Sequence, residues 1–492
     1  MNPLKKLAGQ TAIYGLPSIL LRILGYLLTP LYTRVLDTQE YGSYVYLYSV
    51  VAFMIVVLTY GMETAFFRFY SKDENNEKVY ATSLISLLFT SAIFVVLMLI
   101  YTTPIARAIG YEGRPDYIRY FCFILAFDAI SAIPFAKLRA HNKARRFAVL
   151  RMINIVINIA LNLVFLLLIP AIISGNAPEG SWFVSLFPTQ NLVQYIFISN
   201  LVASAVTLLL LIPEMKISFH AFSPRLLGSM LKYALPLLIA GFAGIINETF
   251  DRVLLKHLLP ADIADSQVGI YGACYKISIL ITLFIQAYRY AAEPFFFSQA
   301  GQKDAKQIYS QMLTYFVLII SIIFLVTMLY LDVIILFIGK DFREGRPVIS
   351  ILMLANICLG IFYNLSIWYK LTSQTLYGAL MAVIGAVITV VLNLWMIPDY
   401  GYMGSAWATL ICYFVMMVIS YRLGQKHFPI RYNLRKIAFY LGGALVIYFV
   451  STLFDSQQIS VRLLVGTALL VLYLTVITIL EYANLKRIIS SR

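Results

Sequence analysis

The sequence predicts an all-α polytopic membrane protein with about 14 transmembrane helices, built as two parallel six-helix repeats plus a terminal helix pair. Hydrophobic residues make up 61% of the chain and charged residues only 12%, whereas a soluble domain carries about 25% charged residues. The apolar residues gather in segments of about 20, the length that crosses a bilayer as a helix. Short sequence patterns also recur in the same order in the two halves of the chain.

Hydropathy windows of about 19 residues place the spans along the chain. The predicted spans are 10–36, 43–66, 80–102, 117–137, 147–171, 190–213, 230–257, 268–292, 308–332, 347–369, 376–398, 402–421, 434–453 and 461–481. Lys and Arg concentrate in alternate loops, on the side that holds both ends of the chain. Because cytoplasmic loops carry the excess of positive charge, both termini are expected in the cytoplasm.

Several functional classes are disfavoured by the same composition. The net charge of +15 follows membrane topology, so nucleic acid is not an expected partner. The loops are too short for a soluble catalytic domain, and no phosphate loop of the GxxxxGK[ST] type occurs, so neither a catalytic residue nor ATP hydrolysis is expected. The four cysteines lie in apolar segments without metal-ligand spacing, so no metal site is expected.

An internal repeat relates spans 1–6 to spans 7–12. Five short patterns match in the same order: Tyr14 to Pro17 with Tyr233 to Pro236, Arg34 to Leu36 with Arg252 to Leu254, Gly42 to Tyr44 with Gly269 to Tyr271, Glu63 to Phe67 with Glu293 to Phe297, and Leu161 to Leu163 with Leu392 to Leu394. An offset of six spans gives both halves the same orientation, and parallel repeats bind substrate at their interface. The expected domains are an N-terminal lobe (1–220), a C-terminal lobe (221–427) and additional helices (428–492).

The first span contains the charge on which the functional hypothesis most depends. Arg22 lies near its middle, and Gly15, Pro17, Gly25 and Pro30 interrupt it. A guanidinium inside the membrane needs an anionic partner, and a broken helix must line protein or a water-filled cavity. We therefore expect a discontinuous helix facing a central cavity, with Arg22 binding a negatively charged substrate.

Two further cations within spans are candidates for the same role. Lys276 is expected in the outer half of span 8 and Arg289 towards its inner end. Cations at different depths suit an anionic headgroup that must cross, and arginine binds phosphate oxygens through two hydrogen bonds. The alternative is that each cation pairs with a neighbouring acid and only holds helices together.

Carboxylates within spans are candidates for coupling or gating. Asp128 in span 4 is either a proton carrier or the partner of Arg22. One helical turn in span 7 carries Glu248, Asp251 and Arg252. These residues are expected to be a gate or a coupling site, or to form a simple ion pair between Glu248 and Arg252.

The inner ends of spans 2 and 8 carry Glu63 and Glu293, close in sequence to Arg68 and Arg289 respectively. Salt bridges between the lobes could close the inner face through these groups, or they could be interfacial anchors. The basic loop 137–146 is expected to contact the anionic inner leaflet, with first capture of a lipid diphosphate as the alternative. The numerous tyrosines are interpreted as interfacial belts and packing.

Together these segments resemble the polysaccharide transporter (Wzx-type flippase) branch of the multidrug/oligosaccharidyl-lipid/polysaccharide exporter superfamily. The local matches are ILLRILGYLLTPLYTRVL in span 1, YGMETAFFRF at the end of span 2, YALPLLIAGFAGIINETFDRVLL in span 7 and GYMGSAWATL at span 12. The resemblance implies a two-lobed, V-shaped fold around a central cavity. Arg22 is similar to the first-helix arginine that peptidoglycan-precursor flippases direct at the diphosphate.

The resemblance also implies a function. It is movement of an undecaprenyl-diphosphate-linked oligosaccharide from the cytoplasmic to the outer leaflet of the bacterial inner membrane, by alternating access, for O-antigen, capsule or exopolysaccharide synthesis. The expected partners are this glycan lipid, membrane lipids, and a glycan polymerase and glycosyltransferases of the same pathway. The protein is expected to be a monomer without a cofactor, and coupling to Na⁺ or H⁺ is one candidate driving force.

Three alternatives remain at this stage. The first is a cation-coupled multidrug antiporter of the same fold, which the positive charge of Arg22 disfavours. The second is a flippase for a lipid II-type peptidoglycan precursor. Such flippases place a basic pair shortly before the acidic end of span 2, where this chain has Val57, Leu58 and Thr59. The third is a polymerase or ligase for the flipped lipid, which the short outer loops disfavour.

Overall fold

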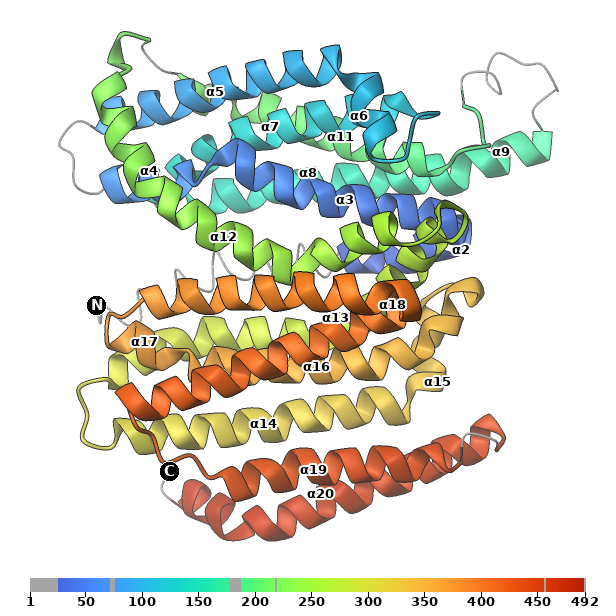
Figure 1. Cartoon of the computed structure of the whole chain (residues 1–492), viewed down its shortest axis with the longest axis vertical. Coiled ribbons are helices and arrows are strands. Elements are labelled where there is room, and N and C mark those ends of the chain that lie inside the picture. The colour runs from blue at the N-terminus through green and yellow to red at the C-terminus, as the bar shows by residue number, and fades with distance from the viewer. Residues whose placement is uncertain (1–24, 71–75, 177–186, 217–218, 455–456, 491–492) are drawn as a thin grey trace. The chain divides into compact units, whose positions relative to one another are not determined.

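The computed structural model describes residues 25–70, 76–176, 187–216, 219–454 and 457–490. The longer helices of the first half are α3 (Thr38–Thr59), α4 (Met62–Tyr70), α5 (Asn76–Ile100), α7 (Pro115–Ala140), α8 (Ala144–Leu163), α11 (Val193–Leu211) and α12 (Pro224–Leu258) (Figure 1). Those of the second half are α13 (Ala261–Gln299), α14 (Ala305–Leu329), α16 (Arg346–Leu365), α18 (Leu376–His427), α19 (Leu434–Thr452) and α20 (Ile459–Ser490). The short helices are α2 (Thr29–Val35), α6 (Thr102–Ala108), α9 (Ile169–Asn176), α15 (Leu331–Ile334) and α17 (Ile367–Leu371).

Helices long and apolar enough to cross a membrane number 12 in the described part of the chain. The predicted all-α polytopic fold is therefore confirmed. Thirteen of the predicted spans fall on these helices, two of them on one helix, while most of the first span lies outside the described residues. The total of 14 and the layout of the repeats stay predictions.

The two predicted spans on one helix are 376–398 and 402–421, which both fall on α18. A continuous helix of 52 residues would be about 78 Å long, more than twice the thickness of the hydrocarbon core. Gly401 interrupts the helix with φ 54° and ψ −137°. Glycine adopts a positive φ at little cost. The break at Gly401 lies in the gap between the two predicted spans.

The chain divides into two compact units. The first comprises Met1–Gly272 and Ala382–Tyr402, and the second comprises Ala273–Met381 and Met403–Arg492. The first unit thus includes α12 and the start of α13, which the sequence analysis placed in the C-terminal lobe. The lobe boundaries rest on the internal repeat and stay predictions.

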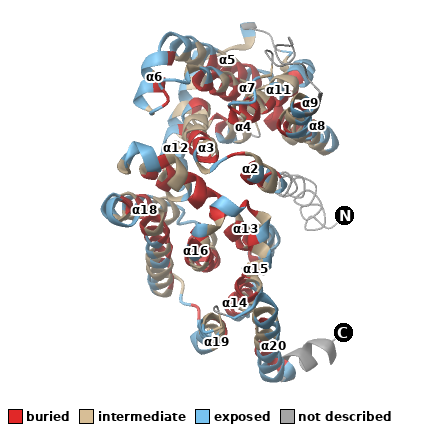
Figure 2. Cartoon of the chain, turned by 90° about the vertical axis from the view of Figure 1, so that its right-hand side faces the viewer, coloured by how far each residue is buried: buried red, intermediate tan, exposed pale blue. Residues whose placement is uncertain are grey.

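Within the first unit, α7 packs against α5 and α11, and α11 also packs against α8. Figure 2 shows buried residues concentrated where α5, α7 and α11 meet. A second buried cluster joins α4, α5, α7 and α12, with Phe66, Leu84, Ile133 and Met230 at its centre. In the second unit α14 packs against α16, α19 and α20.

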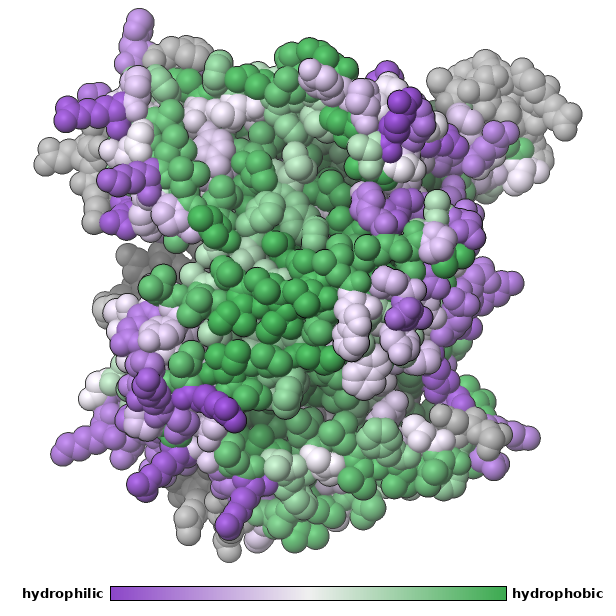
Figure 3. Space-filling view, viewed as in Figure 1, coloured by the Kyte–Doolittle hydropathy of each residue, from purple (hydrophilic) through white to green (hydrophobic). Residues whose placement is uncertain are grey.

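Apolar side chains also cover the outside of the helices. Leucine, valine, isoleucine and phenylalanine are exposed along α5, α18, α19 and α20, for example Phe89, Val387, Phe449 and Leu464. Figure 3 shows apolar residues along the middle of the helices in each unit and hydrophilic residues at their ends. This surface suits lipid, and the chain is a multi-pass membrane protein.

A close backbone contact joins α3 to the start of α13 within the first unit. A Cβ atom added to Gly42 would lie 1.7 Å from the Asp265 carbonyl oxygen, and one added to Gly269 would lie 2.1 Å from the Thr38 oxygen. Ser266 Oγ also donates to Thr38 Oγ1 at 2.8 Å. Gly42 and Gly269 are equivalent in the predicted repeat, so two matching positions lie against each other.

Gly42→Ala should lower the thermal melting temperature of the purified protein. The new methyl group has no space, and overpacking of this kind costs about 1–3 kcal/mol. Gly228→Ala in α12 is the matched control because nothing lies within 4 Å of its added Cβ. It should leave the melting temperature equal or slightly raised. A Gly42→Ala protein as stable as the wild type would show that the α3–α13 contact is not tight.

Candidate functional site

A cavity in the first unit is lined by tyrosines and asparagines together with leucine and isoleucine side chains. Arg22 itself lies outside the described residues, but Gly25, three positions later, lines this cavity of about 190 Å³. The other lining residues come from α2, α3, α8 and α11. They include Tyr32, Tyr44, Tyr48, Asn154, Asn158 and Asn200.

The tyrosines and asparagines form two connected rows. Tyr44 and Tyr48 are four residues apart on α3, with ring centroids 4.8 Å apart, and Asn154 and Asn158 have the same spacing on α8. Residues four apart share one face of a helix, which brings the two rows to the same cavity. Asn200 Nδ2 of α11 donates to the Tyr48 hydroxyl at 2.5 Å.

A second hydrogen-bonded group continues this lining. The Tyr32 hydroxyl donates to Asn162 Oδ1 at 3.1 Å, and Asn162 Nδ2 donates to Asn158 Oδ1 at 2.9 Å. The sequence analysis assigned the tyrosines to belts and packing and therefore missed this site. The signal that could have found it is the four-residue spacing of tyrosines on α3 and asparagines on α8.

Asp128 of α7 is exposed and accepts a hydrogen bond from Ser204 Oγ at 2.9 Å. Arg151 of α8, which the sequence analysis did not select, lies within electrostatic range of this carboxylate. The Arg151 guanidinium lies 4.1 Å from the Phe135 ring centroid. The pairing of Asp128 with Arg22 stays a prediction.

Glu63 and Glu293 occupy similar ion pairs in the two units. Glu63 of α4 pairs with Arg139 of α7, and Glu293 of α13 pairs with Lys370 of α17 at 2.5 Å. The sequence separations are 76 and 77 residues. In both pairs the base lies at the end of the second span after the acid. Each pair joins helices of one predicted lobe, so these contacts do not bridge the lobes.

The two arginines next to these acids in sequence have different surroundings. The Arg68 guanidinium lies 4.0 Å from the Tyr233 ring centroid. Arg289 Nε lies 3.7 Å from Glu293 Oε1 and its guanidinium 4.0 Å from the Tyr363 ring. Lys276 is half-buried on the same helix as Arg289, 13 positions earlier, which is about 20 Å along the helix axis. The two cations therefore lie at different depths.

The cluster in α12 differs in detail from the expected pair. Arg252 Nη1 bonds to Asp251 Oδ1 at 3.1 Å and to the backbone oxygen of Glu248 at 2.6 Å. Asp251 Oδ2 also accepts from the Tyr271 hydroxyl at 2.6 Å. Both charged side chains are buried. The ion pair thus forms with Asp251 and ties α12 to the start of α13.

Polar contacts near the Gly42–Gly269 contact join the same helices. Lys256 Nζ lies 2.6 Å from Asp265 Oδ2, and the Tyr111 hydroxyl donates to Asp265 Oδ1 at 2.9 Å. Burial and the charge of Asp265 raise the pKa of Tyr111 well above its ordinary value, so it remains a donor. Tyr46 and His257 share a hydrogen bond of 2.9 Å. The sequence analysis did not select these residues.

Comparisons with known proteins identify a family for this chain and solved structures with a similar fold. The family model described as "Polysaccharide biosynthesis protein" matches residues 7–300. A protein of the Lsg locus of Haemophilus influenzae is 22% identical over 434 residues, which cover 84% of this chain and 99% of that protein.

Solved structures show the same fold. The lipid II flippase MurJ, in an inward closed conformation, superposes with a TM-score of 0.72 at 15% identity, covering 94% of this chain and 98% of that one. An inward-facing multidrug resistance transporter of the MATE family, in the MOP superfamily, superposes with a TM-score of 0.65 at 15% identity, covering 85% and 94%. The fold is therefore that of these flippases and transporters. Because the family model matches more than half of this chain, the chain belongs to the polysaccharide biosynthesis protein family.

Proposed function

We propose that this protein is a flippase that moves an undecaprenyl-diphosphate-linked oligosaccharide from the cytoplasmic to the outer leaflet of the bacterial inner membrane. The family match and the flippase-type fold support transport in polysaccharide synthesis. The observation that carries the substrate class is the cavity of tyrosines and asparagines, which is also lined by Gly25, three positions after Arg22.

The lining of this cavity suits neutral sugars. Tyrosine rings offer flat apolar faces and a polar hydroxyl, and asparagine amides both donate and accept hydrogen bonds. Sugar rings have the complementary apolar faces and many hydroxyls. Arg22, with Lys276 and Arg289 at other depths, would bind the diphosphate, since guanidinium and ammonium groups form strong hydrogen bonds to phosphate.

Transport would proceed by alternating access with the polyprenyl tail remaining in lipid. Both termini would be cytoplasmic, and the protein would act as a monomer with the polymerase and glycosyltransferases of its pathway. Driving force would come from a Na⁺ or H⁺ gradient, the membrane potential or consumption of the flipped product. Asp128 is the carboxylate we assign to proton coupling, because it lies within a span and accepts a hydrogen bond from the neutral Ser204 hydroxyl.

The two alternative transporters of this fold fit the residues less well. A peptidoglycan precursor role is favoured by the MurJ fold but lacks the basic pair before the acidic end of span 2. There Thr59 Oγ1 donates to the Ile55 carbonyl at 2.7 Å and Leu58 is buried. A cation antiporter is favoured by the MATE fold but would place Arg22 against a cationic substrate.

Arg22→Ala should abolish most surface glycan in cells that depend on this protein, because the diphosphate loses its guanidinium partner. Arg22→Lys should retain more function, since it keeps the charge but not the two-pronged hydrogen bonding. Immunoblotting of surface glycan measures the effect, with Arg435→Ala at an exposed site of α19 as the control. If cells with Arg22→Ala display as much surface glycan as cells with the wild-type protein, Arg22 has a structural role and does not bind the substrate.

Tyr44→Leu should slow translocation of the lipid-linked oligosaccharide in proteoliposomes several-fold, while Tyr44→Phe should retain most of the rate. The phenylalanine keeps the flat ring face and loses only the hydroxyl. The rate is measured by the access of a membrane-impermeant glycosidase to the glycan, with efflux of a cationic dye measured in parallel. If Tyr44→Leu and Tyr44→Phe lower the translocation rate equally, the sugar does not stack on the ring at position 44. Dye efflux without lipid translocation would favour the antiporter.

A further inference from the structure

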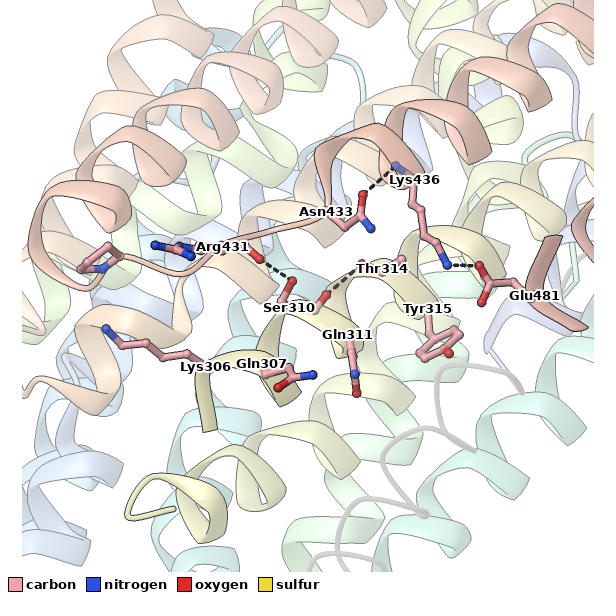
Figure 4. Close-up of a pocket in the computed structure, with 11 residues that line it drawn as sticks. Lys306, Gln307, Ser310, Gln311, Thr314, Tyr315, Arg431, Asn433, Lys436 and Glu481 are labelled. Carbon is pink, nitrogen blue, oxygen red and sulfur yellow. Dashed lines mark hydrogen bonds and ion pairs between the residues drawn. The ribbon is translucent and has the colours of Figure 1, made fainter. Parts of the chain in front are cut away.

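A basic cavity in the second unit lies far along the chain from the proposed substrate groups. Its volume is about 950 Å³, and it lies where α14 and α19 begin and α20 nears its end. Three of its lining residues are cations, Lys306, Arg431 and Lys436, and one is an acid, Glu481. Figure 4 shows Lys306 and Arg431 on one side and the Lys436–Glu481 pair on the other, with Ser310 and Gln311 between them.

The single carboxylate neutralises only one of the three cations. Glu481 is buried, pairs with Lys436 and accepts from the Tyr440 hydroxyl at 2.5 Å. Lys306 and Arg431 are exposed, and neither forms an ion pair with a carboxylate among the residues that the structure describes. The cavity therefore keeps about two positive charges, which favours an anionic ligand.

Backbone and polar groups add to this preference. Ser310 Oγ donates to the Arg431 carbonyl at 2.8 Å, which holds the loop before α19 against α14. Asn433 caps α19 through its bond from the Lys436 backbone nitrogen at 3.1 Å. The start of a helix carries partial positive charge. Gln307 and Gln311 line the cavity and are exposed, so they can donate hydrogen bonds to an oxyanion.

Two of the helices that line the cavity also carry exposed apolar side chains. Phe439 and Val446 on α19 are 46% and 62% exposed, and Leu472 and Ile479 on α20 are 55% and 69% exposed. A ligand with an anionic head and long apolar chains would suit a basic cavity whose lining helices carry exposed apolar residues. Phosphate is the lipid anion that Lys, Arg and amide donors bind best.

We propose that this cavity binds the phosphate headgroup of a membrane lipid whose chains lie along the exposed apolar faces of α19 and α20. The inference does not depend on the proposed flippase function. The same chemistry occurs in an anionic phospholipid and in a polyprenyl phosphate. With both termini cytoplasmic, the site would face the inner leaflet.

Native mass spectrometry of the full chain in detergent tests this proposal. The protein is titrated with phosphatidylglycerol, undecaprenyl monophosphate and neutral phosphatidylcholine. Lys306→Gln/Arg431→Gln should weaken binding of anionic lipid about tenfold or more, since each basic group near a lipid surface contributes to the attraction. Phosphatidylcholine binding should not change. Gln311→Lys should strengthen binding of the anionic lipid several-fold.

The control variant is Lys303→Gln/Arg435→Gln, which removes the same charge from neighbouring positions that do not line the cavity. It should bind lipid like the wild type, and melting temperatures should verify that every variant is folded. If the cavity variant loses binding of phosphatidylglycerol alone, the site belongs to a phospholipid. If it loses binding of undecaprenyl monophosphate alone, the site belongs to a polyprenyl lipid. Unchanged binding by a folded cavity variant, or equal loss in the control, would overturn the proposal.

Discussion

The cost of a charge inside a membrane governs how this structure is held together. Removing an ionised group from water is so expensive that it persists only with a partner. Asp251 with Arg252, both buried, meets this demand, whereas Glu63 with Arg139 and Glu293 with Lys370 are partly exposed pairs at the ends of spans. The Glu63 and Glu293 pairs each join two helices, and Tyr271 extends the Asp251 pair to α13. These groups therefore help to define which helices pack together.

The same arrangement recurs at several positions that the repeat makes equivalent. Asn162 and Asn393 are both buried, and each donates through Nδ2 to the carbonyl four residues earlier. The Glu63 and Glu293 pairs share nearly the same sequence separation. A duplicated sequence that kept only hydropathy would not preserve such contacts. Equivalent positions of the predicted repeat thus make similar contacts, within one helix for the asparagines and between two helices for the glutamates. The residues that line the cavity of tyrosines and asparagines all belong to the first unit.

Hydropathy was sufficient to predict the helices because each span must satisfy its own backbone in lipid. The ion-pair partners could not be predicted in the same way. Arg139 and Lys370 lie at the ends of spans, where they count as loop charges, and their acids are more than seventy residues away in sequence. The surroundings of Arg252 illustrate the same point. The spacing of four offered a pair with Glu248 as one alternative, whereas the contact with Asp251, which also accepts from Tyr271 of another helix, needs the structure to be seen.

The cavity of tyrosines and asparagines differs from the ion pairs in a way that matters for transport. Its hydrogen bonds, such as Asn200 to Tyr48 and Tyr32 to Asn162, join neutral groups, which are far less costly to separate in the membrane than ions. In the proposed function, two hydroxyls of one sugar can each pair with one partner of such a bond, so that neither partner is left unsatisfied. A ligand without hydroxyls would leave the asparagine amides without hydrogen-bond partners. Binding sites built to hydrogen-bond a ligand hydroxyl strongly reject ligands that lack it. Neutral hydrogen-bonding groups therefore suit the transient part of the cycle, while the ion pairs suit the permanent framework.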